Sequence, residues 1–121
     1  MTVTVTVGNV ALYVSDLERS ERFYADVLGL EVTARVDTPD VREVLFGPLM
    51  LAKETAPTGP IAPSGIWKVF LFVDDAPGLH EQAVASGAES VMMPTYLEQF
   101  DITIAMVRDP DGYLLELGQR H

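Results

Sequence analysis

Two halves of this sequence repeat one another, and the repeat constrains the fold more than any other feature. The run VALYVSDL at residues 10–17 aligns with VFLFVDDA at residues 69–76, a shift of 59 residues. In each half, an apolar strand pattern is followed by a capping residue, an amphipathic helix, a glycine and three further strand patterns. Because such a repeat sets the architecture, we predict an α+β fold built from two β-α-β-β-β modules.

The period of the apolar residues predicts the elements of each module. Strands are expected at residues 2–14, 30–36, 41–46 and 49–53, and again at 68–73, 90–93, 102–107 and 113–117. The first helix is expected to follow Ser15, which forms a capping-box spacing with Glu18. The second is expected to follow Asp74 or Asp75.

The predicted modules, residues 1–53 and 66–121, are separated by a segment of different composition. Residues 54–65, ETAPTGPIAPSG, hold three prolines and two glycines and show no packing pattern, which is typical of a linker. A chain of 121 residues has the length of one ordinary domain. We therefore expect a single domain, residues 1–121, made of two modules.

The residue inventory excludes several kinds of site. The chain has no cysteine, which excludes disulfides, thiolate zinc sites, iron–sulfur clusters and a cysteine nucleophile. Its two histidines, His80 and His121, are too few for a three-histidine metal site within one chain. His80 is expected on the surface of the second helix, and His121 at a mobile end.

Charge and hydropathy limit the classes of partner that the chain could bind. Eighteen acidic residues against eight basic ones give a net charge of −10, which repels phosphate backbones and argues against nucleic acid. The same charge favours a cationic ligand at long range, although solubility alone also explains it. No apolar run approaches the roughly 20 residues that span a bilayer, and the N-terminus lacks the basic region of a signal peptide. We expect a cytoplasmic protein with no membrane partner.

Two longer motifs resemble a known family. The run VALYVSDLERSERFYADVLGLEV resembles the opening of vicinal oxygen chelate (VOC) proteins, the superfamily of glyoxalase I, bleomycin resistance protein and extradiol dioxygenase. RDPDGYLLELGQ resembles its closing hairpin and last strand, so the resemblance covers about residues 8–119. It implies curved mixed sheets around a cavity, whereas function has to be argued from the site itself.

The resemblance also implies where metal ligands would lie, on the first and last strands of each module. These positions fall on Asn9, on a residue near Leu51, on Lys68 and on Glu116. Metalloenzymes of the family carry His or Gln at the first and third positions and Glu at the second and fourth, so only Glu116 matches. A protonated lysine has no lone pair for a metal. We therefore predict no metal or other cofactor, with a non-standard divalent metal site around Glu116 as the disfavoured alternative.

Lys68 and Glu116 are expected on neighbouring strands of one module, pointing inward. One interpretation is a structural cross-strand ion pair that satisfies both groups. The other is a site in which Lys68 holds an anionic or carbonyl oxygen of a ligand and Glu116 acts as base or acceptor.

Aromatic residues would line the remaining cavity and its mouth. Four lie near inward positions: Tyr13, Trp67, Phe70 and Phe72. The segment 94–101, expected to be a loop, adds Tyr96 and Phe100 beside carboxylates, a combination suited to a flat or cationic group. Ordinary core packing and a surface turn are the alternative interpretations.

Together these features favour a metal-independent protein that binds or sequesters a small organic molecule in an aromatic-lined cavity. The alternative is a VOC-type lyase, isomerase or dioxygenase that uses Glu116 with a non-standard metal, or Lys68 and Glu116 without one. A third possibility is an interaction module whose cavity is filled by its own side chains. Small members of the family usually dimerise, so the resemblance implies a homodimer.

Overall fold

A computed structural model describes residues 2–63 and 67–121 of the chain. The chain divides between Ile61 and Ala62 into two compact units, unit 1 and unit 2. This division falls inside the predicted linker, residues 54–65, whose last two residues lie outside the described part. Within that part, we find no helix long and apolar enough to cross a membrane.

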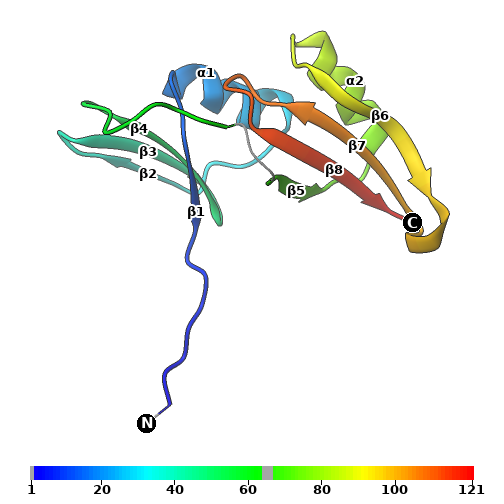
Figure 1. The fold of residues 1–121 in the computed structure, drawn as a ribbon, viewed down its shortest axis with the longest axis horizontal. Coiled ribbons are helices and arrows are strands. Elements are labelled where there is room, and N and C mark those ends of the chain that lie inside the picture. Colours follow the sequence, from blue (N-terminus) through cyan, green and yellow to red (C-terminus); the bar gives the residue numbers. More distant parts are fainter. Residues whose placement is uncertain (1, 64–66) are drawn as a thin grey trace. The chain divides into compact units, whose positions relative to one another are not determined.

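Within the described residues, each unit contains one α-helix and one four-stranded sheet (Figure 1). Unit 1 comprises β1 (Val10–Tyr13), α1 (Leu17–Arg22) continued by the π-helical turn η1 (Phe23–Val27), β2 (Ala34–Asp37), β3 (Val41–Phe46) and β4 (Leu49–Glu54). Unit 2 comprises β5 (Val69–Phe72), α2 (Ala76–Ala85), β6 (Ser90–Leu97), the 3₁₀ turn η2 (Glu98–Phe100), β7 (Ile102–Arg108) and β8 (Leu114–Arg120).

The two sheets have the same topology. Their strand orders are β1-β4-β3-β2 and β5-β8-β7-β6, and in each the first pair is parallel while the others are antiparallel. The predicted α+β fold with two β-α-β-β-β modules is therefore confirmed.

One face of each sheet packs against the helix of its own unit and forms that unit's core. In unit 1 the buried apolar side chains of this core include Leu12, Val14, Leu17, Phe23, Tyr24, Val44, Phe46, Leu49 and Leu51. In unit 2 they include Ala76, Ala83, Ala105, Val107, Leu115 and Leu117. Burial of a large apolar side chain contributes about 1.5–3 kcal/mol, so these faces hold each helix on its sheet.

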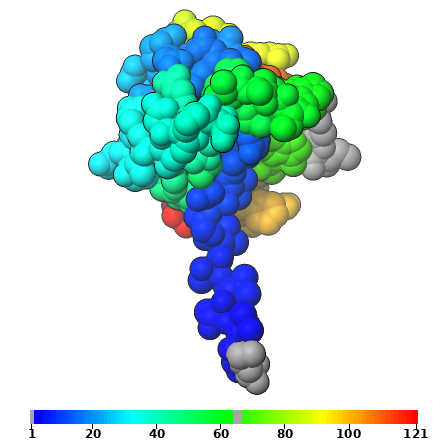
Figure 2. All heavy atoms as spheres, turned by 90° about the vertical axis from the view of Figure 1, so that its left-hand side faces the viewer, coloured from blue at the N-terminus to red at the C-terminus, as the bar shows by residue number. Residues whose placement is uncertain are grey.

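The first strand is shorter than predicted. Residues 2–9 carry no strand hydrogen bonds and stand clear of the rest of unit 1 (Figure 2), and Val3, Val5 and Val7 are exposed. The register explains the difference, since Val10 pairs with Leu49, the first residue of β4. Residues before Val10 run past the end of their neighbouring strand and find no partner in it, whatever their β-propensity.

Helix caps are partly as predicted. Asp75 caps α2, where its side chain accepts a hydrogen bond from the Gly78 amide. The predicted Ser15 cap of α1 is wrong, because the extended residue is Asp16, whose Oδ1 accepts from the Arg19 amide at 3.0 Å. Ser15 instead accepts a hydrogen bond from the Arg19 guanidinium.

Three further expectations need correction. The segment expected to be a loop at residues 94–101 continues β6 to Leu97 and then forms η2. His80 is buried rather than exposed, and its Nε2 lies 2.7 Å from the hydroxyl of Ser90 at the start of β6. His121 is held directly after the end of β8, with Nε2 2.7 Å from the Thr103 hydroxyl and its amide donating to the Asp101 carbonyl.

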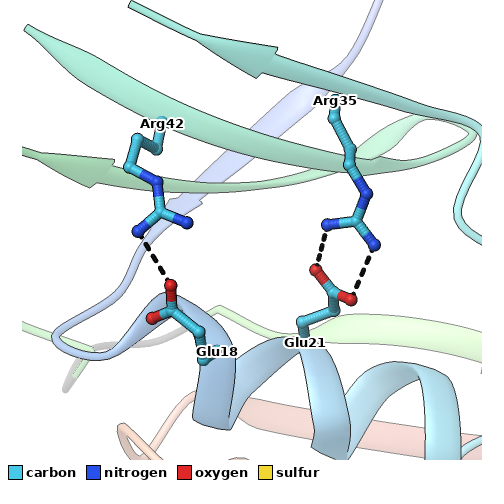
Figure 3. Close-up of polar contacts among 4 residues, drawn as sticks. All are labelled: Glu18, Glu21, Arg35 and Arg42. Atoms are coloured by element: carbon cyan, nitrogen blue, oxygen red, sulfur yellow. Dashed lines mark hydrogen bonds and ion pairs between the residues drawn. The ribbon is translucent and has the colours of Figure 1, made fainter. Parts of the chain in front are cut away.

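Two ion pairs tie α1 to the sheet of unit 1 (Figure 3). Glu21 forms a bidentate pair with Arg35 of β2, and Glu18 pairs with Arg42 of β3 at 2.8 Å. The Arg35 guanidinium, mainly through its hydrogen bonds, holds the pKa of Glu21 below its ordinary value. The pairs are exposed to water, so each contributes little to stability.

Acid is expected to weaken the Glu21 pair. Because the pKa of Glu21 is lowered in the fold, its stabilisation is complete above the unfolded value of about 4.3 and is lost as the pH falls through the folded value. Between about pH 6 and pH 3, the free energy of unfolding should fall in both proteins. We expect the fall to be about 0.5 kcal/mol smaller in Glu21→Gln than in the parent, as measured by urea unfolding at each pH. Glu31→Gln, which removes an exposed carboxylate lacking an ion pair in the described part, is the control and should follow the parent. Equal acid losses in all three proteins would contradict the prediction.

Candidate functional site

The sheet of unit 2 has one face packed against α2 and one face turned away from it. Leu115 and Leu117 of β8 are buried on the α2 side, and the Gln119 side chain accepts a hydrogen bond from the Ala76 amide at the start of α2. The alternate residues therefore point to the other face. We call this the open face, formed by Lys68, Phe70, Phe72, Glu116, Gly118 and Arg120, with Ile102, Ile104 and Met106 of β7 and Leu97 of β6 beside them.

An ion pair lies on the open face, as one interpretation of the sequence predicts. The Lys68 ammonium group contacts Oε1 of Glu116. The side chain of Glu116 is 7% exposed and that of Lys68 46%, so a nearly buried carboxylate meets a partly hydrated cation. In the described part, Oε1 is shielded from water and has no conventional hydrogen bond, which leaves Lys68 as its stabilising partner.

Two phenylalanine rings form an aromatic surface next to this pair. Phe70 and Phe72 meet edge to face, with centroids 4.9 Å apart, and they remain 39% and 61% exposed. Gly118 of β8 makes room for the Phe70 ring. A Cβ atom there would lie 2.9 Å from Cε1 of Phe70 and 3.1 Å from Cδ1 of Ile102, so the Phe70 ring occupies the space that a side chain would need.

Arg120 completes the open face. Its guanidinium carbon lies 3.9 Å from the centroid of the Phe72 ring, a cation–π contact. The structure gives Arg120 no ion pair with any described residue. An aromatic surface is thus flanked by a paired lysine on one side and an arginine without a carboxylate partner on the other.

The remaining aromatic candidates of unit 2 lie apart from Phe70 and Phe72. Trp67 packs edge to face on Tyr113, with centroids 5.2 Å apart. Tyr96 pairs with Thr103, which places it on the opposite face from Leu97, and its hydroxyl donates to Asp101 at 2.8 Å. That hydrogen bond raises the pKa of Tyr96. Phe100 is exposed in η2.

An open hollow lies at this end of the sheet. Its volume is about 490 Å³, and it is lined by residues from Tyr96 to Gln99. Leu97, which lines it, belongs to the same cross-strand row as Ile102 and Arg120. The hollow therefore adjoins the end of the open face at which Arg120 stands.

The corresponding face of unit 1 carries Tyr13, which is exposed and alternates with the buried Leu12, whereas Asn9 is exposed and precedes β1. The register also locates the position predicted near Leu51. Ala11 pairs with Met50 as Phe70 pairs with Glu116, so the counterpart of Glu116 is Met50, one residue before the predicted position. Leu51 itself is fully buried and faces the helix.

The donors at the four family positions do not suit a divalent metal. Asn9, Met50, Lys68 and Glu116 supply one carboxylate, one amide, a thioether and an ammonium group that already pairs with the carboxylate. Zinc and its relatives need several imidazole, thiolate or carboxylate donors. In residues 2–63 and 67–121 there is also no cluster of three or more His, Asp or Glu side chains that could hold a metal ion.

Sequence reasoning missed Gly118 and Arg120. Both follow Glu116 at intervals of two along β8 and therefore share its face. Extending the alternation from Glu116 to the end of the strand would have found them, but the predicted strand ended at residue 117 and Arg120 fell outside it.

Comparisons with known proteins agree with this architecture. The model of the Glyoxalase/Bleomycin resistance protein/Dioxygenase superfamily matches residues 6–117. The chain is 28% identical to lactoylglutathione lyase GLX1 of Arabidopsis thaliana over an alignment 122 residues long. The alignment covers 93% of this chain but only 43% of that protein. This chain thus spans less than half of that relative.

Solved structures show the same fold. Glyoxalase I from Zea mays superposes with a TM-score of 0.78 at 23% identity, over 94% of this chain and 44% of that one. TnmS3, an antibiotic binding protein from Streptomyces sp. CB03234, superposes with a TM-score of 0.74 at 22% identity, over the full length of both chains.

Proposed function

The chain belongs to the Glyoxalase/Bleomycin resistance protein/Dioxygenase superfamily, and we propose that it binds a small organic molecule with a flat apolar body, without a metal. The observation that carries this proposal is the pair of exposed phenylalanine rings on the open face of unit 2. The function is binding or sequestration rather than metal-dependent chemistry, because the donor set at the family positions is unsuited to a metal.

Exposed aromatic rings of this kind gain free energy when an apolar ligand covers them and removes their surface from water. Phe70 and Phe72 of β5 lie side by side, and Ile102 and Met106 of β7 lie on the same face across the intervening strand β8. Each square ångström of apolar surface that a ligand removes from water contributes about 25 cal/mol. Aromatic surface with a few charged groups at its edge is typical of small-molecule sites. The likeness in fold to TnmS3, described as an antibiotic binding protein, supports the proposal.

A matched series of small probes tests it. 2-Naphthalenemethanol, 2-naphthoate and 2-naphthylmethylammonium share one flat body and differ in charge. With about 12 non-hydrogen atoms and about 0.3 kcal/mol per atom, we expect a Kd of about 2 mM or tighter for the neutral alcohol. Titration of ¹⁵N-labelled protein in the presence of EDTA should shift the amide signals of Phe72 and Gly118.

A pair of alanine variants serves as the control. Phe72→Ala should abolish or strongly weaken binding of the alcohol, whereas Phe100→Ala, which removes an equally exposed ring from η2, should leave it unchanged. Absence of binding by all three probes would overturn the proposal. Binding that disappears with EDTA would overturn its metal-independent part.

A second candidate function is enzymatic. The nearly buried Glu116 carboxylate beside the Lys68 ammonium group favours it, because such a pair can move a proton on a ligand bound to the open face. The relation to lactoylglutathione lyases names the first assay. Lactoylglutathione lyase activity that Glu116→Gln abolishes would favour the enzyme, and its absence together with probe binding would favour the binding protein.

The expected homodimer and the expected cytoplasmic location stay proposals. Analytical ultracentrifugation of the full chain tests the first: a mass of one chain at all concentrations would contradict it.

A further inference from the structure

We propose that the ligand of the open face carries an acidic group, such as a carboxylate, and that Arg120 binds this group. The inference rests on the proposed function, since it names the class of molecule that the same face accepts. It assigns Arg120 as the residue that selects for charge and Phe70 with Phe72 as the residues that hold the body.

The geometry of Arg120 suits an anion. The guanidinium carbon of Arg120 lies 3.9 Å from the centroid of the Phe72 ring. No hydrogen bond or ion pair joins the N–H edge of this guanidinium to any described residue. That edge matches a carboxylate, which it binds through two parallel hydrogen bonds. A side chain already positioned in this way loses less conformational entropy when a ligand binds.

The charges of the open face point the same way. The register places four charged residues on this face, namely Lys68, Arg108, Glu116 and Arg120. Lys68 pairs with Glu116, and Arg108 lies 3.7 Å from Glu89. Arg120 is left with no carboxylate in the described part, so the face carries one uncompensated positive charge although the chain as a whole carries −10. The net charge of the chain favours a cation at long range, whereas the local charge of Arg120 favours an anion on the open face.

The spacing along β8 sets the size of the ligand's body. Arg120 and Glu116 are four residues apart, or about 13 Å along an extended strand. The two phenylalanines of β5 and the bare Gly118 lie in this interval. A body of two fused rings therefore fits against Phe70 and the outer edge of Phe72, with its acidic group at Arg120 and Leu97 and Ile102 at the same end.

The naphthalene series separates this inference from the proposed function. We expect 2-naphthoate to bind roughly 10- to 100-fold more tightly than 2-naphthalenemethanol, the range given by hydrogen bonds to a charged partner. Arg120→Gln should remove this preference, so that the acid and the alcohol bind with similar Kd values in the variant, and should weaken the acid far more than the alcohol. Arg120→Lys keeps the positive charge but loses the two parallel N–H donors of the guanidinium, and should retain only part of the preference for the acid. Arg22→Gln, at an exposed arginine of α1, should behave like the parent.

Each other outcome has a defined meaning. If the alcohol binds through Phe72 but the acid binds no more tightly, or if the ammonium compound binds best, this inference is overturned and the proposed function stands. If the preference for the acid survives Arg120→Gln in a variant with parental circular dichroism, Arg120 is not the residue responsible. If no probe shifts the amides of the open face, another part of the chain or a second copy covers it, and both proposals fail.

Discussion

Replacing Lys68 with methionine is expected to destabilise unit 2 by about 2 kcal/mol. The substitution leaves the nearly buried carboxylate of Glu116 without its ion-pair partner. Losing one partner of a fully buried pair costs about 3–5 kcal/mol, and losing one partner of an exposed pair about 0.2–1 kcal/mol. This pair lies between these limits, because Glu116 is shielded from water while Lys68 is partly hydrated.

A second substitution distinguishes an uncompensated charge from lost packing. Lys68→Met combined with Glu116→Leu should recover most of the stability, since two apolar side chains then replace the pair on an apolar face. Lys53→Met provides the control, because the other lysine of the chain has no ion pair with any described residue. Urea unfolding followed by circular dichroism and by fluorescence of Trp67, the only tryptophan, measures all four proteins.

The result bears on what the pair does. If the double variant remains as unstable as Lys68→Met, packing by the lysine stem rather than its charge explains the loss, and Glu116 does not need a cation. If it is stable but fails to bind the naphthalene probes, the pair serves binding rather than folding. These two outcomes decide between the two interpretations of Lys68 and Glu116 that the sequence left open.

The fold could be predicted from the sequence because its information is local and occurs twice. A strand, a cap, a helix and a glycine recur at the same shift, and each copy supports the interpretation of the other. The errors occur in strand bounds that depend on whether a partner strand is present. Residues 2–9 have the alternation of a strand, yet β4 begins at Leu49 and offers them no partner. Pairing partners depend on tertiary structure, which a propensity pattern does not contain.

The candidate site could be predicted in part for the same reason. The resemblance predicted Lys68 and Glu116 on neighbouring strands, and alternation along the first of these strands put Phe70 on the face of Lys68; in the structure Lys68 contacts Glu116 and Phe70 pairs with it. In unit 1 a difference of one residue, Leu51 for Met50, moved the prediction from the open side to the core, because a slip of one reverses the face of a strand. Arg120 gains its significance from its stacking on Phe72 and from the absence of a carboxylate partner in the described part, and neither is visible in sequence.

Gly118→Val is expected to destabilise unit 2 by about 2 kcal/mol, although valine is a favourable residue for a strand. The Phe70 ring already fills the space above Gly118, as the short distances to a Cβ atom there indicate. A valine must displace this ring or the Ile102 side chain. Propensity alone predicts the opposite sign, so the direction of the change tests the packing.

The double-mutant cycle with Phe70→Ala makes the test specific. Once the ring is removed, valine at position 118 should cost less than about 0.5 kcal/mol, a coupling of about 1.5 kcal/mol between the two positions. Gly8→Val, at a glycine with nothing within 4 Å, should leave stability unchanged. An equal cost of Gly118→Val with and without Phe70 would mean that the ring does not lie over Gly118. The aromatic surface depends on that placement, because the bare backbone at position 118 leaves room for the Phe70 ring, which there meets the Phe72 ring edge to face.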